Sequence, residues 1–142
     1  MSAQITTVTM PLRWGDMDQV GHVNNIQYFE YIQEARLVLL RQLRTGLQLP
    51  TGQGFVLAST QCDFVRELVW PGEIAITQQL VKLGRSSFTI SNTLYRTDAP
   101  DAICARGLSV IVWRNHALGK AEALPDEIRA RLMTFLPDGQ TE

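Results

Sequence analysis

The segment from Asn25 to about Gly46 limits most strongly how this chain can fold. Its residue spacing predicts one long helix, with Asn24 as the N-cap and Gly46 as the stop. One stripe at helical spacing carries five polar or charged side chains, namely Gln27, Glu30, Glu34, Arg41 and Arg44. Nearly every other position is apolar, so more of the helix circumference needs cover than a surface helix usually buries. We therefore expect a central helix that a sheet wraps.

The rest of the chain has the pattern of strands. Before the helix, residues 7–14 alternate between polar and apolar side chains, which predicts a strand with one buried face that extends to Trp14. Four further strands are predicted at 55–65, 73–83, 87–96 and 103–113. Their connections are turns and short loops, which indicates an antiparallel, meander-like sheet. Pro125 and the two acids after it open a short amphipathic helix that ends near Leu136.

This order of elements predicts an α+β fold in which an antiparallel sheet wraps around one long central helix, with a short C-terminal helix. The 142 residues contain no repeat and no internal boundary, so we expect a single domain over residues 1–142. One sheet covers only part of so apolar a helix, and its edge strands are open to pairing. Both features predict a homodimer or a larger homo-oligomer.

Charge and cysteine usage narrow the range of partners. The formal net charge is -1 and the pI is near 6.1, so no basic surface indicates a nucleic-acid or membrane partner. The first ten residues lack the pattern of a secretory signal, and no apolar run reaches membrane-spanning length. Cys62 and Cys104 lack CxxC spacing, which is typical of reduced thiols in a cytoplasmic protein.

A polar turn at 15–22 contains the residues with the clearest chemistry. Asp16, Asp18 and His22 stand just before the predicted helix start. That end of a helix carries unpaired N–H groups and a partial positive charge, which suit an anion or a developing oxyanion. A carboxylate beside such donors can act in hydrolysis, but an Asp in a turn can equally well cap the loop. The ligands needed for a calcium loop or a transition-metal site are missing nearby, so we expect no metal and no cofactor.

The same stretch carries a family resemblance. The run DMDQVGHVNNIQYFEYIQEAR resembles the signature of the hotdog-fold acyl-CoA thioesterases, specifically the 4-hydroxybenzoyl-CoA thioesterase-like family. The similarity continues through PGE at 71–73, GRSSF at 84–88 and LPDEI at 124–128. The resemblance implies a hotdog fold and the hydrolysis of a fatty or aromatic acyl-CoA to the free acid and CoA. It also implies a dimer or tetramer whose sites are built from two chains.

The resemblance assigns catalytic roles to residues of the turn and the helix start. Asp18 matches the catalytic carboxylate, which acts as nucleophile or general base. Asn25 matches the position whose backbone N–H polarises the thioester carbonyl. His22, Asn24 and Tyr28 match residues that orient water or the acyl group.

The resemblance also implies a CoA-binding segment and further candidates for the catalytic acid. The segment that contacts the CoA phosphates, usually across a subunit interface, is matched by Lys82, Arg85, Ser86 and Ser87. Some subgroups use a glutamate of the central helix as the catalytic acid, and Glu30 and Glu34 are available here. Two alternatives to hydrolysis also stay open: a module that binds acyl-CoA or an acyl-carrier protein without turnover, and a hotdog dehydratase.

Overall fold

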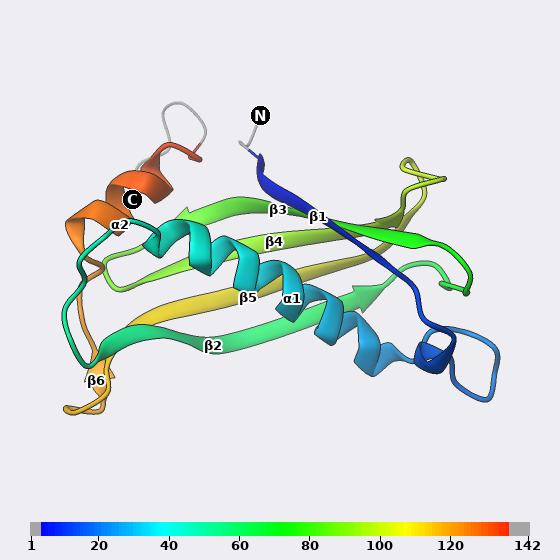
Figure 1. Ribbon diagram of the computed structural model, residues 1–142, viewed down its shortest axis with the longest axis horizontal. Helices are drawn as coiled ribbons and strands as arrows, with labels where there is room; N and C mark the ends of the chain where they lie inside the picture. Colours follow the sequence, from blue (N-terminus) through cyan, green and yellow to red (C-terminus); the bar gives the residue numbers. More distant parts are fainter. Residues whose placement is uncertain (1–3, 137–142) are drawn as a thin grey trace.

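The computed structural model describes residues 4–136 as an antiparallel sheet with one long helix lying across it (Figure 1). The elements in chain order are β1 (Gln4–Pro11), the 3-10 turn η1 (Trp14–Asp16), α1 (Asn25–Arg44), β2 (Gln53–Phe64), β3 (Glu73–Leu83), β4 (Ser87–Arg96), β5 (Ile103–Asn115), the short β6 (Lys120–Ala121) and α2 (Asp126–Met133). This is the α+β layout that the sequence predicts, with the sheet curved around α1.

Local sequence signals set most of the element ends. The side chain of Asn24 accepts the N–H of Ile26 at 3.0 Å, so the predicted N-cap of α1 is confirmed. Beyond the other end, Gly46 has a φ of 78°, a conformation that glycine adopts without strain. The ends of β3 and β4 are those predicted, whereas α2 stops at Met133 rather than near Leu136.

The strand order corrects the predicted meander. The order across the sheet is β1-β3-β4-β5-β2, so only β3, β4 and β5 follow one another as neighbours, while β2 pairs with β5. The connection at 65–72 is not a tight hairpin. It stays attached to β5, because the N–H groups of Val65 and Arg66 both donate to the carbonyl of Cys104, and then it crosses the end of the sheet. Because of this crossing β2 does not pair with β3, and β1 pairs with β3 instead.

The first strand ends earlier than predicted. It stops at Pro11, and Trp14 begins η1 with 73% of its surface exposed instead of lying on a buried face. The turn forms because the Asp16 carboxylate accepts the backbone N–H of Arg13 and pairs with its guanidinium. That capping interaction bends the chain away from β3 before Trp14 can join the sheet.

The sheet covers one side of α1. The buried side of the helix consists of Tyr28, Tyr31, Ile32, Ala35, Leu39 and Leu43. On the remaining surface Ile26 is 62% exposed and Leu37 is 53% exposed. The large apolar circumference that the sequence indicates is therefore only partly satisfied by the described residues.

Two further expectations concern the cysteines and the membrane. Cys62 and Cys104 are free thiols, as predicted, and burial raises the pKa of Cys62 to about 11. Between residues 4 and 136 no helix has the length and apolar character needed to cross a bilayer.

The packing of the central strand β4 predicts a large stability effect. Leu94 is fully buried between α1 and the sheet, so Leu94→Ala should lower the free energy of unfolding by about 2–5 kcal/mol. Leu118 lies in an exposed loop, and Leu118→Ala should change the same quantity by less than about 0.5 kcal/mol. Urea unfolding followed by circular dichroism measures both, and equal losses would contradict this placement of the core.

Candidate active site at the start of α1

Asp16 is a buried anchor between the polar turn and α1. Its side chain is 3% exposed, and Oδ2 accepts the Tyr31 hydroxyl at 2.8 Å. Its Oδ1 lies 2.9 Å from the Arg13 guanidinium, and its backbone carbonyl accepts the N–H of Asn24 at 2.9 Å. A buried carboxylate with these partners holds the turn against the helix start and has a structural role.

Asp18 lies two residues later in an exposed loop. A bridge between Met17 and Val23 closes this loop at its base. The Oδ1 atom of Asp18 accepts the N–H of Val20 at 2.9 Å and that of His22 at 3.4 Å. One carboxylate oxygen thus shapes the loop. Elsewhere in residues 4–136 no donor reaches the other oxygen, Oδ2, which leaves it available for chemistry.

The loop and the helix start form one wall of a hollow of about 360 Å³. The hollow is lined by Asp18, His22, Val23, Asn25, Tyr28, Phe64, Val65, Arg66 and Glu67. The structure therefore brings together four residues predicted from the sequence, namely Asp18, His22, Asn25 and Tyr28. Asn24 serves as the helix cap beside them and is not part of the lining.

The helix start supplies a free donor to this hollow. Asn25 is the first residue of α1, so its N–H has no acceptor within the helix. The cap oxygen of Asn24 is taken by Ile26, and no other acceptor in the described part of the chain reaches the Asn25 N–H. The donor and the positive end of the helix dipole therefore lie in the same hollow as the Asp18 carboxylate.

The opposite wall comes from the end of β2 and the connection after it, which sequence reasoning missed. His22 Nε2 lies 3.0 Å from the Glu67 carboxylate, and the Tyr28 ring packs edge-on to Phe64 with centroids 5.0 Å apart. The N–H of Val23 donates to the carbonyl of Leu68 at 2.7 Å, which fixes the connection beside the turn. No local motif marks these residues, because the contact joins segments some 45 positions apart.

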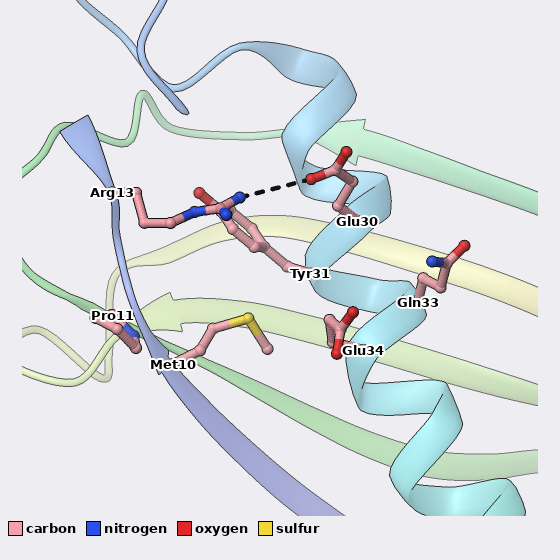
Figure 2. A pocket seen from close by; sticks show the side chains of 7 residues that line it. All are labelled: Met10, Pro11, Arg13, Glu30, Tyr31, Gln33 and Glu34. Carbon is pink, nitrogen blue, oxygen red and sulfur yellow. Dashed lines mark ion pairs between the residues drawn. The ribbon is translucent and has the colours of Figure 1, made fainter. Parts of the chain in front are cut away.

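The acids of the helix lie in a different hollow. Figure 2 shows this space, of about 480 Å³, which is lined by Met10, Pro11, Arg13, Glu30, Tyr31, Gln33 and Glu34. Glu30 there lies 3.7 Å from the guanidinium of Arg13. The two hollows share no lining residue, so within one chain neither Glu30 nor Glu34 joins Asp18. His22 pairs with Glu67 rather than with a helix acid, which is not the pairing that a dehydratase requires.

The residues matched to CoA binding lie at the other end of the sheet. Lys82, Arg85, Ser86 and Ser87 surround the turn between β3 and β4, whereas the Asp18 hollow lies near the start of β3 (Figure 1). The 11 residues of β3 separate the two places by roughly 33 Å. Within one chain the two sets are not brought together. Their meeting across a subunit boundary stays a prediction.

A metal-binding role finds no support in this geometry. Across the described range, 4–136, no three His, Cys, Asp or Glu side chains cluster so that they could hold an ion. The chemistry available at the hollow is that of a carboxylate, an imidazole and backbone donors.

Comparisons with known proteins show the family of this chain. Residues 12–132 match the thioesterase-like superfamily. The chain is 32% identical to the PA2801 protein of Pseudomonas aeruginosa, a candidate thioesterase, with a TM-score of 0.82 over 91% of this chain and 98% of that one. It is 29% identical to a candidate acyl-CoA thioesterase from Xanthomonas campestris, with a TM-score of 0.74 over 85% and 99% of the two chains. It is also 28% identical over 122 residues to the uncharacterized protein YsmA of Bacillus subtilis strain 168, which covers 86% of this chain and 81% of YsmA.

The two tyrosines of the site predict a loss of stability at alkaline pH. Burial raises the pKa of Tyr28 to about 12, and burial together with the hydrogen bond to Asp16 raises the pKa of Tyr31 further. Their stabilisation is complete below the unfolded pKa of about 10 and is lost as the pH rises through the folded values. The urea midpoint should therefore fall above about pH 10, and it should fall less in a Tyr28→Phe/Tyr31→Phe variant. A fall of equal size in that variant would assign the effect to other groups.

Proposed function

The chain belongs to the thioesterase-like superfamily and is a hotdog-fold thioester hydrolase, and from this premise we propose that it hydrolyses an acyl-CoA in the hollow at the start of α1, with Asp18 as the catalytic carboxylate. The observation that carries the proposal is that Asp18 and Asn25, whose N–H has no acceptor among the described residues, both line the same 360 Å³ hollow. A carboxylate and an oxyanion donor are the two groups that thioester hydrolysis needs most.

The reaction follows from these two groups. The thioester carbonyl oxygen accepts the Asn25 N–H, which polarises the carbon for attack. Asp18 then either takes a proton from the attacking water or attacks the carbon itself; in the second case loss of the CoA thiolate leaves an anhydride, which water then cleaves to the acid and the free Asp18 carboxylate. The C–S bond breaks, the acid forms, and CoA leaves as a thiolate whose conjugate acid has a pKa of roughly 8.5, so its departure needs little help from an acid.

The remaining residues of the hollow support this chemistry by position. The His22 backbone N–H donates to Asp18 Oδ1 and its imidazole lies 3.0 Å from Glu67, and in this proposal the imidazole orients water or the acyl group. Asn24 keeps the first turn of α1 in place through its cap hydrogen bond. Tyr28 and Phe64 form an apolar wall, which suits a fatty or an aromatic acyl group.

A second copy of the chain completes the site in this proposal. The CoA phosphates need cations, and Lys82, Arg85, Ser86 and Ser87 lie too far from Asp18 in the same chain to supply them. The edge strand β2 offers unpaired backbone groups, and Leu57 and Phe64 are exposed along it. Pairing through such an edge joins two sheets and covers apolar surface that one chain leaves open.

Replacement of the catalytic carboxylate tests the first part of the proposal. Asp18→Asn keeps the size of the side chain but removes its charge, so kcat should fall by about 10²–10⁴-fold. Thiol release from a panel of acyl-CoA substrates, followed with DTNB, measures the loss. Wild-type rates in this variant on every active substrate would overturn the assignment of Asp18.

Asp101→Asn is the matched control, because Asp101 is exposed in the turn between β4 and β5, does not line the hollow and does not lie on the β2 edge. Its rates should stay within about twofold of the wild type. If the wild type binds acyl-CoA tightly but releases no thiol from any member of the panel, the chain is a binding module instead.

Mixing two inactive variants tests the shared site. Asp18→Asn lacks the carboxylate, and Lys82→Ala/Arg85→Ala lacks the proposed phosphate contacts. If each site takes residues from both chains, random exchange between the two variants should restore about a quarter of the intact sites of a two-fold dimer. Light scattering would confirm the dimer, and no recovery of activity after proven subunit exchange would contradict a shared site.

A further inference from the structure

A polar row crosses the apolar floor beneath α1. Gln78 on β3 and Asn92 on β4 are direct neighbours in register, and each is 1% exposed. On β5 the register partner of Asn92 is Gly107. Ser109 lies two residues further along β5 on the same face, diagonal to Asn92, and its hydroxyl lies 3.2 Å from that of Thr60 on β2. This row separates the two apolar clusters of the core.

Polar atoms of the Gln78 and Asn92 amides, at one end of this row, lack hydrogen-bond partners in the described part of the chain. Gln78 donates to the carbonyl of Ala35 at 2.8 Å, but its own Oε1 and both polar atoms of the Asn92 amide have no partner among the described residues. Buried amide groups without hydrogen-bond partners destabilise a fold. A bound ligand that supplies such partners would account for these atoms.

An unpaired cation stands above the same region. Arg36 is half-buried on α1, and burial lowers the pKa of its guanidinium. Within residues 4–136 it forms no ion pair and no hydrogen bond. The removal of a charge from water without a counter-charge is unfavourable, so an anion beside Arg36 would stabilise the site.

One ring contact and one shared hollow identify the side of α1 that faces β2. At one end of this side Phe29 packs against Phe64 with ring centroids 6.4 Å apart, and at the other end Leu40 and Phe55 line a second hollow of about 840 Å³. At 100° per residue Arg36 lies between Phe29 and Leu40 on the same helix stripe. It therefore lies over the middle of β2, where Thr60 ends the polar row.

The distance from the thioester fits an acyl group. Asn25 and Arg36 are eleven residues apart on nearly the same stripe, which corresponds to a rise of roughly 16 Å. An acyl chain that runs from the Asn25 donor along the side facing β2 would carry its far end to the Arg36 region. Resting on the function proposed above, we propose that this region binds a carboxylate at the far end of the acyl group, so that the preferred substrates are CoA monothioesters of dicarboxylic acids.

The Arg36 guanidinium would neutralise the terminal carboxylate and donate a bidentate hydrogen bond to it. The hydroxyl and amide donors of the polar row would lie beside this pair. Two other anions could in principle meet Arg36, namely the phosphates of CoA and a carboxylate of a second copy. Neither would distinguish between acyl groups on the same carrier, and this difference is what the experiment measures.

The test compares pairs of acyl-CoA substrates of equal length, about eight to fourteen carbons, with and without a terminal carboxylate, because an extended chain of about 13 carbons at about 1.25 Å per carbon spans the rise of roughly 16 Å. The wild type should favour the carboxylated member by at least about tenfold in kcat/KM. Arg36→Gln should lower kcat/KM for that member by about 10–100-fold and leave the plain acyl-CoA within about twofold. Arg36→Lys keeps the charge but loses the bidentate geometry of the guanidinium. Its kcat/KM for the carboxylated member should lie between that of the wild type and that of Arg36→Gln.

Arg106→Gln is the matched control, because it makes the same charge change at an exposed position of β5 that neighbours the buried Ala105 and Gly107 on the opposite face. It should change neither substrate by more than about twofold. Equal losses on both members of a pair in Arg36→Gln would assign Arg36 to the CoA phosphates, and loss of the oligomer would assign it to the subunit interface. Either result overturns the proposal, as does a wild type with no preference for the carboxylate.

The outcome is separable from that of the proposed function. If the wild type cleaves plain acyl-CoA but shows no carboxylate preference, hydrolysis stands and the Arg36 inference falls. If the wild type cleaves none of the substrates, hydrolysis falls, and calorimetric binding of the same pairs to the wild type and to Arg36→Gln decides the inference by the same ratios.

Discussion

The geometry of the site depends on the buried carboxylate of Asp16. Its hydrogen bond from Tyr31, its ion pair with Arg13 and its backbone bond from Asn24 tie the end of β1, the polar turn and the start of α1 into one unit. A buried charge of this kind is stable only while its partners stay in place, which makes the arrangement all-or-none. Asp18 is exposed, but it lies only two residues from Asp16, so the contacts of Asp16 also fix the position of Asp18. Two identical side chains thus differ in role because one is buried among partners and the other keeps an oxygen free.

Sequence reasoning was most reliable where a single residue sets the local structure. The Asn24 cap, the Gly46 stop and the turns around β3 and β4 follow from local backbone chemistry, and the structure confirms them. The strand order was wrong because it depends on how the chain crosses the end of the sheet, and alternation along a strand carries no information about its neighbours. Trp14 was misplaced because the Asp16 carboxylate caps Arg13 three residues earlier, a side-chain contact that the alternation of polar and apolar residues does not reveal. The motif around Asp18 located one wall of the hollow, but no local signal marked the wall that carries Glu67.

A single chain leaves apolar helix surface and a sheet edge uncovered, and the described residues explain why. A sheet presents one face to a helix, so α1 can bury only about half of its apolar circumference, and Ile26 and Leu37 remain exposed. β2 lies at the edge of the same sheet, and most of its middle is exposed. An exposed helix side next to an exposed strand edge is the arrangement that a second copy covers with the fewest new contacts. Under the proposed function the separation between Asp18 and Lys82 points the same way, because an acyl-CoA is longer than the hollow assigned to its thioester.

Thioester hydrolysis needs few catalytic groups. Substrate specificity must therefore come from residues other than those that contact the reacting atoms. A thiolate leaves readily, so a carboxylate and one good oxyanion donor suffice, and such a donor alone contributes about 10²–10³ in rate. These groups contact only the thioester, which every acyl-CoA shares. Discrimination must then come from the walls, and the walls differ: Tyr28 and Phe64 are apolar at the mouth, whereas the polar row and Arg36 lie further along α1. A pocket built only to exclude water would place apolar side chains there, so the polar atoms and the unpaired charge are the features that a specific acyl group would have to match.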